Sequence, residues 1–272
     1  MLNDFTQQII QEFRANQGEV GGPFAGARLL LLTTVGARSG QPHTTVLGYY
    51  PDKDGRVLVV GSAGGGPKHP DWYHNLLATP RVTVETGTFT YEADAAVLEG
   101  AERDEIFARL VEADAGWGEY QARTTRTIPV VALSQIDPGS PRGGSFAETL
   151  LMIHGLFRRE LTVIGKELAA AGPKLGAQLK INCLTLCQGL HYHHTGESIG
   201  LFPALLEAHP DLAPTIAELQ SEHDKIAVVL EELQHLVGTP APPAEVLPKV
   251  DRLIADLNDH LDHEEAKLIP LL

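Results

Sequence analysis

The sequence has only two cysteines, Cys183 and Cys187, and they stand four residues apart in a stretch with helical apolar spacing. This placement disfavours a disulfide, because one helix holds the two side chains in a poor geometry for the bond. We therefore expect both cysteines to be buried thiols in a protein of a reducing compartment.

Long apolar runs and positive charge are also scarce. No stretch approaches the roughly 18 consecutive apolar residues of a membrane span, and the first residues show no basic region followed by an apolar run. There are 21 Lys and Arg residues against 35 Asp and Glu residues, which gives a net charge of −14. Nucleic acid and anionic membrane surfaces repel such a chain, so we expect a cytoplasmic protein that acts on a small molecule.

The length of 272 residues suits two domains, and the composition marks a division between them. Residues 137–145 are rich in Pro and Gly, which is typical of a linker. Ser145 and Glu148 then have the spacing of a capping box, which begins a helix. We predict one domain over residues 1–136 and a second over residues 146–272.

The second domain contains four segments with apolar residues at helical spacing, and each carries a histidine on its apolar side. In two of them a glutamate follows the histidine by four residues, which places both side chains on one face of a helix. The pattern predicts an all-α, up-down four-helix bundle with these groups facing inward. The six residues are His154, His193, Glu197, His223, His260 and Glu264.

Histidines and carboxylates inside a bundle are costly unless something binds them. A single core histidine is more often satisfied by a hydrogen bond, but six N and O donors on four helices are typical of a dinuclear carboxylate site. Imidazole with carboxylate suits iron first, with manganese or zinc as alternatives, and the lack of core-facing thiols beyond Cys183 argues against an iron–sulfur cluster. We therefore expect two non-haem iron ions, held by these six residues.

With its repeated His-x-x-x-Glu phrases, the stretch 146–272 resembles a hemerythrin-like, HHE cation-binding domain. The resemblance implies that the four histidines are terminal ligands and that Glu197 and Glu264 bridge the irons. Oxygen-carrying hemerythrins have a further histidine where this chain has Leu219, so the resemblance implies an open coordination position instead of reversible oxygen carriage. Four neighbouring histidines are expected at the surface or behind the ligands, namely His191, His194, His235 and His263.

The first domain alternates short strands with turns and a few helices, which predicts a small α+β barrel. We expect strands at 28–35, 43–50, 56–61, 81–86, 89–98 and 129–135, and helices at 4–16, 70–78, 102–113 and 119–123.

Two loops of this domain, 33–42 and 62–75, carry candidate binding groups. Three successive glycines at 64–66 lead towards a helix, so their backbone N–H groups could bind an anion, with Lys68 or Arg38 adding charge. This signal is weak by itself, because glycine-rich loops between strands are more often only turns.

The phrases LLLLTTVGARSGQPHTTVLGYY, GPKHPDWYHNLLATP, EYQARTTR and RTIPVV resemble the deazaflavin-dependent nitroreductase family, a split β-barrel of the flavin-reductase type. The family often has basic residues where this chain has Ala37, His43 and Ala63. Fewer cations would then meet the anionic tail of coenzyme F420, and FMN is the alternative cofactor. The resemblance implies cofactor contacts by Arg38, Ser39, His43, Ser62, Lys68, Trp72 and Asn75, with Trp117 and Tyr120 bordering the substrate as catalytic residues. Trp72 has a second interpretation, as a helix aromatic packed in the core.

Together these features predict a two-domain oxidoreductase. A split β-barrel would bind reduced deazaflavin or flavin, and the hemerythrin-like bundle would reduce a small oxidant, such as dioxygen, peroxide or nitric oxide, at a di-iron site. In the alternative, the bundle binds oxygen, nitric oxide or iron and regulates a nitro or quinone reductase domain. A third interpretation keeps the metal purely structural. A homodimer is compatible with the sequence.

Overall fold

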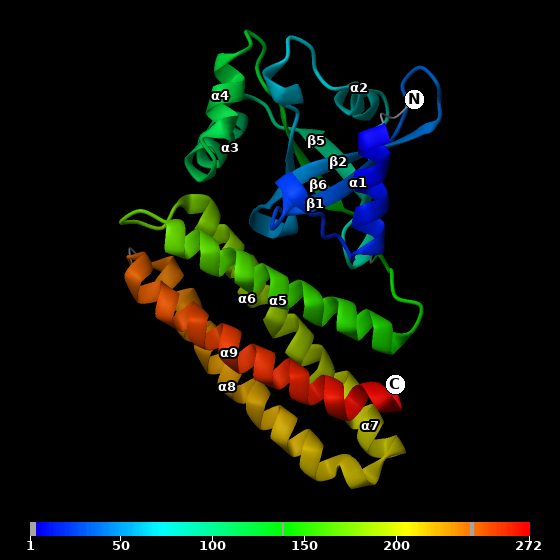
Figure 1. The fold of residues 1–272 in the computed structure, drawn as a ribbon, viewed down its shortest axis with the longest axis vertical. Coiled ribbons are helices and arrows are strands. Elements are labelled where there is room, and N and C mark those ends of the chain that lie inside the picture. The colour runs from blue at the N-terminus through cyan, green and yellow to red at the C-terminus, as the bar shows by residue number, and fades with distance from the viewer. Residues whose placement is uncertain (1–3, 138, 240–241) are drawn as a thin grey trace. The chain divides into compact units, whose positions relative to one another are not determined.

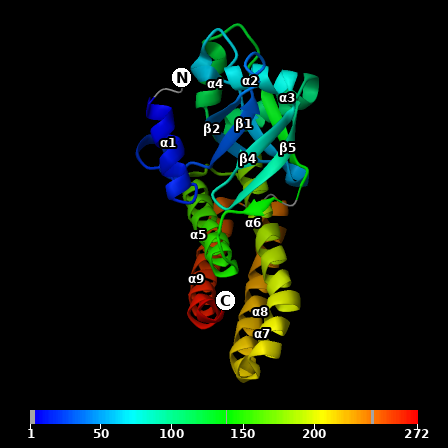
Figure 2. The same cartoon turned by 90° about the vertical axis from the view of Figure 1, so that its right-hand side faces the viewer.

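The computed structural model describes residues 4–137, 139–239 and 242–272. The chain divides into two compact units, Met1–Gly144 and Ser145–Leu272, which are drawn in Figures 1 and 2. Within the described residues, no helix combines the length and the apolar composition needed to cross a membrane.

In the first unit, over the described residues 4–137, six antiparallel strands close into a barrel in the order β4-β1-β2-β3-β6-β5, with β5 pairing back to β4 (Figure 1). The predicted barrel class is therefore confirmed. A short strand, β7 (Ser140–Pro141), adds to β5 inside the stretch predicted as a linker. Pro138, also in that stretch, lies outside the described residues. The barrel strands are β1 (Leu29–Val35), β2 (Pro42–Pro51), β3 (Val57–Val60), β4 (Arg81–Glu85), β5 (Phe89–Val97) and β6 (Val130–Gln135).

Strand β1 begins with four leucines because both of its faces are covered there. Side chains alternate between the faces of a strand. Leu30 and Leu32 therefore enter the core inside the barrel, and Leu29 and Leu31 pack with the outer helix α1 (Asp4–Ala15). Such two-sided burial explains why four leucines stand in a row without polar alternation.

Three further helices, α2 (Asp71–Ala78), α3 (Gly100–Ala113) and α4 (Gly116–Ala122), pack on the barrel. Helix α2 contributes Leu76 to the core inside the barrel. Helix α3 covers the outer face of β3 and β6, where Leu110 packs with Leu58 and Val130. The two candidate binding loops, 33–42 and 62–75, thus connect strands and helices that are anchored in the hydrophobic cores of this unit.

In the second unit, over the described residues from 145 onward, four long helices pack in a ring in which α5 contacts α6, α6 contacts α8, α8 contacts α9 and α9 contacts α5. Figure 2 shows them running lengthwise beside one another. Their apolar seams meet in one core, which confirms the predicted bundle. The capping box is present, since Ser145 Oγ accepts a 3.1 Å hydrogen bond from the N–H of Glu148. The helices are α5 (Phe146–Ala170), α6 (Ala177–Gly196), α8 (Ala213–Gly238) and α9 (Pro243–Leu268).

Helix α6 does not continue as a regular α-helix past Gly196. It widens into a π-helical turn, η4 (Glu197–Leu201), and then tightens into the short helix α7 (Phe202–Ala208). A π turn inserts an extra residue and is found most often at functional sites. Its first residue is Glu197, one of the predicted metal ligands.

Buried Asp52 joins the turn after β2 to helix α3. Its carboxylate accepts hydrogen bonds from Arg56 Nη2 at 2.7 Å and from Arg109 Nη2 at 2.6 Å. Burial by itself would raise the pKa of Asp52, but the hydrogen bonds from Arg109 and Arg56 outweigh it and hold the pKa below its ordinary value of 3.8.

Replacing Asp52 by Asn should destabilise the barrel by roughly 2–3 kcal/mol at neutral pH, because Arg109 loses its counter-charge and Arg56 is left with the exposed Glu102. A lowered folded-state pKa stabilises the fold above the unfolded-state pKa, and this contribution is lost as the pH falls through the folded value. The difference between wild type and variant should therefore narrow below about pH 4. Both tryptophans, Trp72 and Trp117, lie in this unit, so tryptophan fluorescence during denaturant unfolding reports on it. The exposed Asp54, replaced by Asn, is the control. A difference that stayed constant from pH 7 to pH 3 would contradict the assignment.

Candidate metal centre and cofactor loops

The bundle holds two adjacent groups of possible metal ligands that share Glu197. In each group the ligand atoms lie within 4.8 Å of one another. The first group is His194, Glu197, His223 and His260, and the second is His154, His193, Glu197 and Glu264. The structure thus brings together all six predicted ligands and adds His194.

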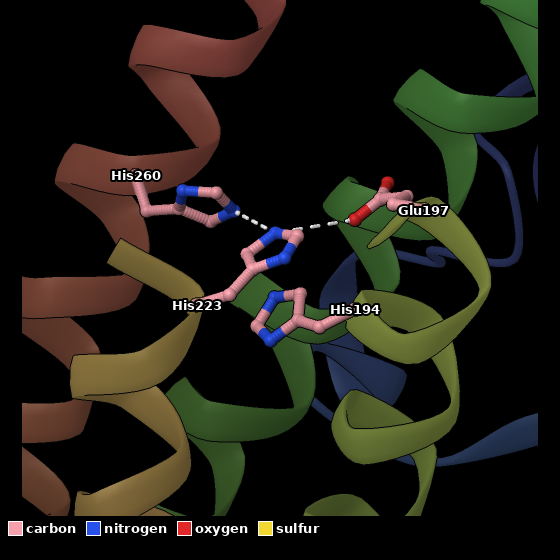
Figure 3. Close-up of side chains that lie close together, drawn as sticks. All are labelled: His194, Glu197, His223 and His260. Carbon is pink, nitrogen blue, oxygen red and sulfur yellow. Dashed lines mark hydrogen bonds and ion pairs between the residues drawn. The ribbon is translucent and has the colours of Figure 1, made fainter. Parts of the chain in front are cut away.

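In the first group the imidazole of His223 lies between its partners (Figure 3). Its Nε2 is 3.1 Å from Nε2 of His260 and 3.5 Å from Oε2 of Glu197. The ring of His194 stacks on the ring of His223, with centroids 4.3 Å apart. Three helices, α6, α8 and α9, therefore contribute to this group.

The second group is arranged around the two carboxylates. Oε1 of Glu197 is 3.2 Å from Nε2 of His193 and 4.0 Å from Nε2 of His154. Oε2 of Glu264 is 3.6 Å from Nε2 of His154 and 3.7 Å from Nε2 of His260, which belongs to the first group. Both glutamates thus lie between histidines of the two groups, as bridging carboxylates would.

Hydrogen bonds on the outer side orient three of the imidazoles. Nδ1 of His154 is 2.8 Å from Glu265 Oε1, and Nδ1 of His260 is 2.9 Å from Glu222 Oε2. Nδ1 of His223 is 3.1 Å from the hydroxyl of Ser198. A carboxylate at Nδ1 fixes the proton there, which leaves the Nε2 lone pair directed inward as a ligand.

The inward atoms have no protein partners that satisfy them. Among the described residues, Nε2 of His154, His193 and His194 is buried without a hydrogen bond, as are both carboxylate oxygens of Glu197 and Glu264. Each unsatisfied buried polar atom costs about 1–3 kcal/mol. Imidazole and carboxylate donors left unpaired in this way fit a pair of iron, manganese or zinc ions.

Burial also sets the protonation of the site. It lowers the pKa of His154, His193 and His223 to about 3, with smaller effects from neighbouring positive charges, and it lowers the pKa of His194 as well. The histidines are therefore neutral near pH 7, which is the form that binds metal. Burial raises the pKa of Glu197 and Glu264, so a bound cation would displace protons from the carboxyl groups.

His194 was expected at the surface or behind the ligands, and the structure buries it within the first group. A signal was available in the sequence, because His194 stands three residues before Glu197 and therefore shares its helix face, as His193 does at four. The place of a third-helix histidine is taken by Leu219, which is fully buried among apolar side chains including Phe202 and Leu268.

In the first unit, the predicted contacts in the loop between β1 and β2 and at the start of β2 are exposed. Arg38, Ser39 and His43 lie on the surface, and Ser39 Oγ is 3.1 Å from His43 Nε2. A Cβ at Gly36 would lie 2.4 Å from Ser39 Oγ and 2.7 Å from His43 Nε2, so a side chain there would require both neighbours to shift. The loop is therefore compact, with its polar groups accessible.

The two predicted contacts on α2 are placed differently. Trp72 is 6% exposed and belongs to the core inside the barrel. Asn75 is buried, accepts a 3.0 Å hydrogen bond from the N–H of Ala37 and donates a 3.0 Å bond to Thr34 Oγ1. Trp72 therefore packs in the barrel core, as in the second of its two interpretations. The side-chain amide of Asn75 holds the first loop in place.

The glycine-rich loop is held in shape by an arginine that the sequence did not single out. Arg126 donates to three backbone carbonyls, those of Ser62 at 2.5 Å, Gly66 at 3.0 Å and Gly61 at 3.1 Å. In the sequence nothing separates it from Arg123, three residues earlier, which is exposed.

The expectation that the three glycines offer free N–H groups is wrong for two of them. The N–H groups of Gly65 and Gly66 donate to the carbonyls of Ser62 and Ala63, both at 3.0 Å. Ser62 is half-buried and Lys68 is exposed. Among the described residues, neither Lys68 nor Arg38 makes an ion pair, so both charges remain available to an anionic cofactor tail, which fits a deazaflavin.

Trp117 and Tyr120 lie together on α4, with ring centroids 6.0 Å apart, and both are half-buried. The indole of Trp117 donates a 2.8 Å hydrogen bond to the hydroxyl of Tyr50. The glycine loop contacts this helix closely, since a Cβ at Gly65 would lie 2.8 Å from the carbonyl oxygen of Tyr120. The predicted substrate-side residues and the predicted cofactor loop are therefore neighbours.

Two family models match this chain. Residues 6–135 match the F420H(2)-dependent quinone reductase family, and residues 145–272 match the hemerythrin HHE cation binding domain.

Individual proteins agree with the first match. An F420H(2)-dependent quinone reductase of Mycobacterium tuberculosis is 40% identical over 129 residues, which cover 45% of this chain and 85% of that protein. A solved structure described as an F420-H2 dependent reductase is 39% identical and covers 39% of this chain and 94% of that chain, with a TM-score of 0.36. Another, described as a domain-swapped dimer, is 35% identical and covers 47% of this chain and 93% of that chain, with a TM-score of 0.38. The chain therefore belongs to the F420H(2)-dependent quinone reductase family and carries a hemerythrin HHE cation-binding domain as its second half, which confirms both predicted resemblances.

Proposed function

We propose that this protein is an oxidoreductase that oxidises reduced F420 in its barrel and delivers the electrons to a small oxidant at a metal pair in its bundle. The observation that carries the proposal is the pair of ligand groups sharing Glu197, whose buried atoms lack protein partners. Family membership supports the barrel's part in it. Dioxygen, peroxide and nitric oxide are the candidate oxidants at the metal pair, and the names of the relatives favour a quinone as an acceptor at the barrel.

In the barrel, the chain's own residues bind and orient. Arg38 and Lys68 would neutralise the anionic tail of the cofactor, while Asn75 and Arg126 hold the two loops from behind. Ser39, His43 and Ser62 offer polar contacts, and Trp117 and Tyr120 border the substrate side. When bound, reduced F420 supplies a hydride.

In the bundle, seven side chains would hold two metal ions, with Glu197 and Glu264 as bridges. His194 takes part in the group that contains His223 and His260, so Leu219 does not leave that group short of an imidazole. Glu222 and Glu265 keep their histidines in the metal-binding tautomer. A metal pair supplies a site where an oxidant can accept electrons.

The ligand assignment predicts metal content. Wild type should bind about two metal ions per chain. Glu197→Ala should lose both ions because both groups contain that residue, and Glu264→Ala should lose at least one. His194→Ala should lower the affinity for metal by roughly 10- to 100-fold. His191→Ala, on the exposed side of the same helix, should leave the metal affinity unchanged. Elemental analysis after metal loading and dialysis measures this. Two ions retained in the double glutamate variant would refute the assignment.

The charges predict how the cofactor binds. Lys68→Ala and Arg38→Ala should each weaken F420 binding by about threefold to fivefold, and the effect should shrink at high salt, because exposed ion pairs are screened. Lys53→Ala, an exposed lysine in the turn after β2, is the matched control. Fluorescence titration of the full chain with F420 and with FMN decides between the two cofactors. Tight FMN binding without F420 binding would overturn the cofactor assignment.

Electron delivery is tested by adding reduced F420 to the iron-loaded protein without oxygen. The absorption of the ferric centre should bleach, and Glu197→Ala, lacking the metal, should still reduce a quinone but show no ferric signal. If the spectrum of the wild type stayed unchanged while quinone reduction proceeded normally, the regulatory alternative would be favoured over electron delivery.

A further inference from the structure

One pocket of the bundle leads from the surface of helix α5 to the second ligand group. It has a volume of 590 Å³ and is lined almost entirely by apolar surface from α5, the end of α6 and the π turn. The lining residues are Phe146, Thr149, Leu150, Ile153, Tyr192, His193, Gly196, Glu197, Gly200 and Leu201. Helices α5 and α6 are adjacent in the bundle (Figure 1).

The pocket is far larger than a gas molecule requires. A molecule the size of water takes up about 30 Å³ of liquid volume, whereas small-molecule pockets measure about 300–1,000 Å³. At 590 Å³ this pocket falls in the second range. Its size therefore admits a ligand with at least one ring, in addition to any diatomic oxidant.

The polarity of the pocket is one-sided. The hydroxyl of Thr149 donates to the carbonyl of Ser145 at 3.0 Å, and the hydroxyl of Tyr192 accepts a 3.2 Å hydrogen bond from Gln188. His193 Nε2 and the Glu197 carboxylate are buried and unpartnered. A polar group of a ligand is thus received at the metal end, while the remaining walls, including the aromatic rings of Phe146 and Tyr192, suit an apolar ring.

The π turn forms part of the wall. Glu197, Gly200 and Leu201 all belong to it and line the pocket. A Cβ added at Gly196 or Gly200 would meet no atom within 4 Å, so the glycines leave open space along this wall. An extra residue in the turn is a poorer helical geometry that persists where it serves a site.

We propose that this pocket binds a neutral aromatic molecule of the phenol or quinol class, with its ring against Phe146 and Ile153 and its oxygen directed towards His193 and Glu197. Because the pocket ends at the proposed metal pair, this site rests on the proposed function. The chemistry is that of binding and orientation. The ring is held by apolar contact and one hydroxyl oxygen is positioned at the ligand group.

The test uses the full-length, metal-loaded protein with phenol as the probe and azide as a small ligand that needs no ring site. Calorimetry gives both affinities. Phenol should bind to wild type. Phe146→Ala, at an exposed position of the pocket wall, should lower the affinity for phenol by roughly tenfold and leave the affinity for azide unchanged. Gly200→Leu should fill the pocket and abolish phenol binding while metal content stays at the wild-type level.

Leu184→Ala is the matched control, because Leu184 is an exposed apolar residue of α6 outside the pocket, and it should leave both affinities unchanged. Normal metal content and azide binding without phenol binding would overturn the aromatic site and leave the metal centre intact. Equal phenol affinity in wild type, Phe146→Ala and Gly200→Leu would overturn it as well. Absence of metal from the wild type would instead refute the proposed function.

Discussion

The buried carboxylate of Glu197 is the group on which the second unit depends most. It lies within ligand distance of histidines from three helices, and neither of its oxygens has a hydrogen-bond partner. Burial removes the carboxylate of Glu197 from water, and the neighbouring Glu264 repels it, so its pKa is raised. The surrounding imidazoles are neutral and cannot compensate it. A pair of cations would satisfy the carboxylate and the imidazoles together, so the metal would be part of the core of the bundle as well as its reactive site.

The outer hydrogen bonds make this arrangement specific. Glu222 contacts both His260 and His263, and Glu265 contacts His154 while also pairing with Arg158 at 2.7 Å. Hydrogen bonds from His260 and His263 hold the pKa of Glu222 below its ordinary value, against the effect of its burial. Nδ1 of His154 and Nδ1 of His260 are thereby satisfied, whereas Nε2 of His154 and the carboxylate oxygens of Glu197 and Glu264 stay without partners in the ligand groups.

In the first unit, polar side chains stabilise the conformations of two surface loops. Their exposed cations cannot fix a conformation, so the buried Asn75 and the half-buried Arg126 do this. Asn75 bridges the first loop to the barrel, and Arg126 gathers three carbonyls of the second. The cations are therefore free to meet an anionic ligand. A hydride donor in these loops would supply electrons and a metal pair in the bundle would offer a site that accepts them, which is the physical reason for proposing that one chain uses both.

The sequence by itself determined the two folds, the family and six of the seven converging side chains that could hold metal. The spacing of apolar residues can be recognised without knowing how the segments pack together. The apolar helix faces around His154 and His223 and the bounds of the barrel strands could therefore be predicted to within a few residues. Tertiary structure alone decided which polar groups lie inside. His194 is buried because α6 packs against α8, where its ring stacks on that of His223. Trp72 is buried because α2 packs into the barrel core. Arg126 reaches three carbonyls of the glycine-rich loop, whereas Arg123 is exposed and pairs with Glu119. These outcomes depend on contacts between segments far apart in the chain, which local spacing does not encode.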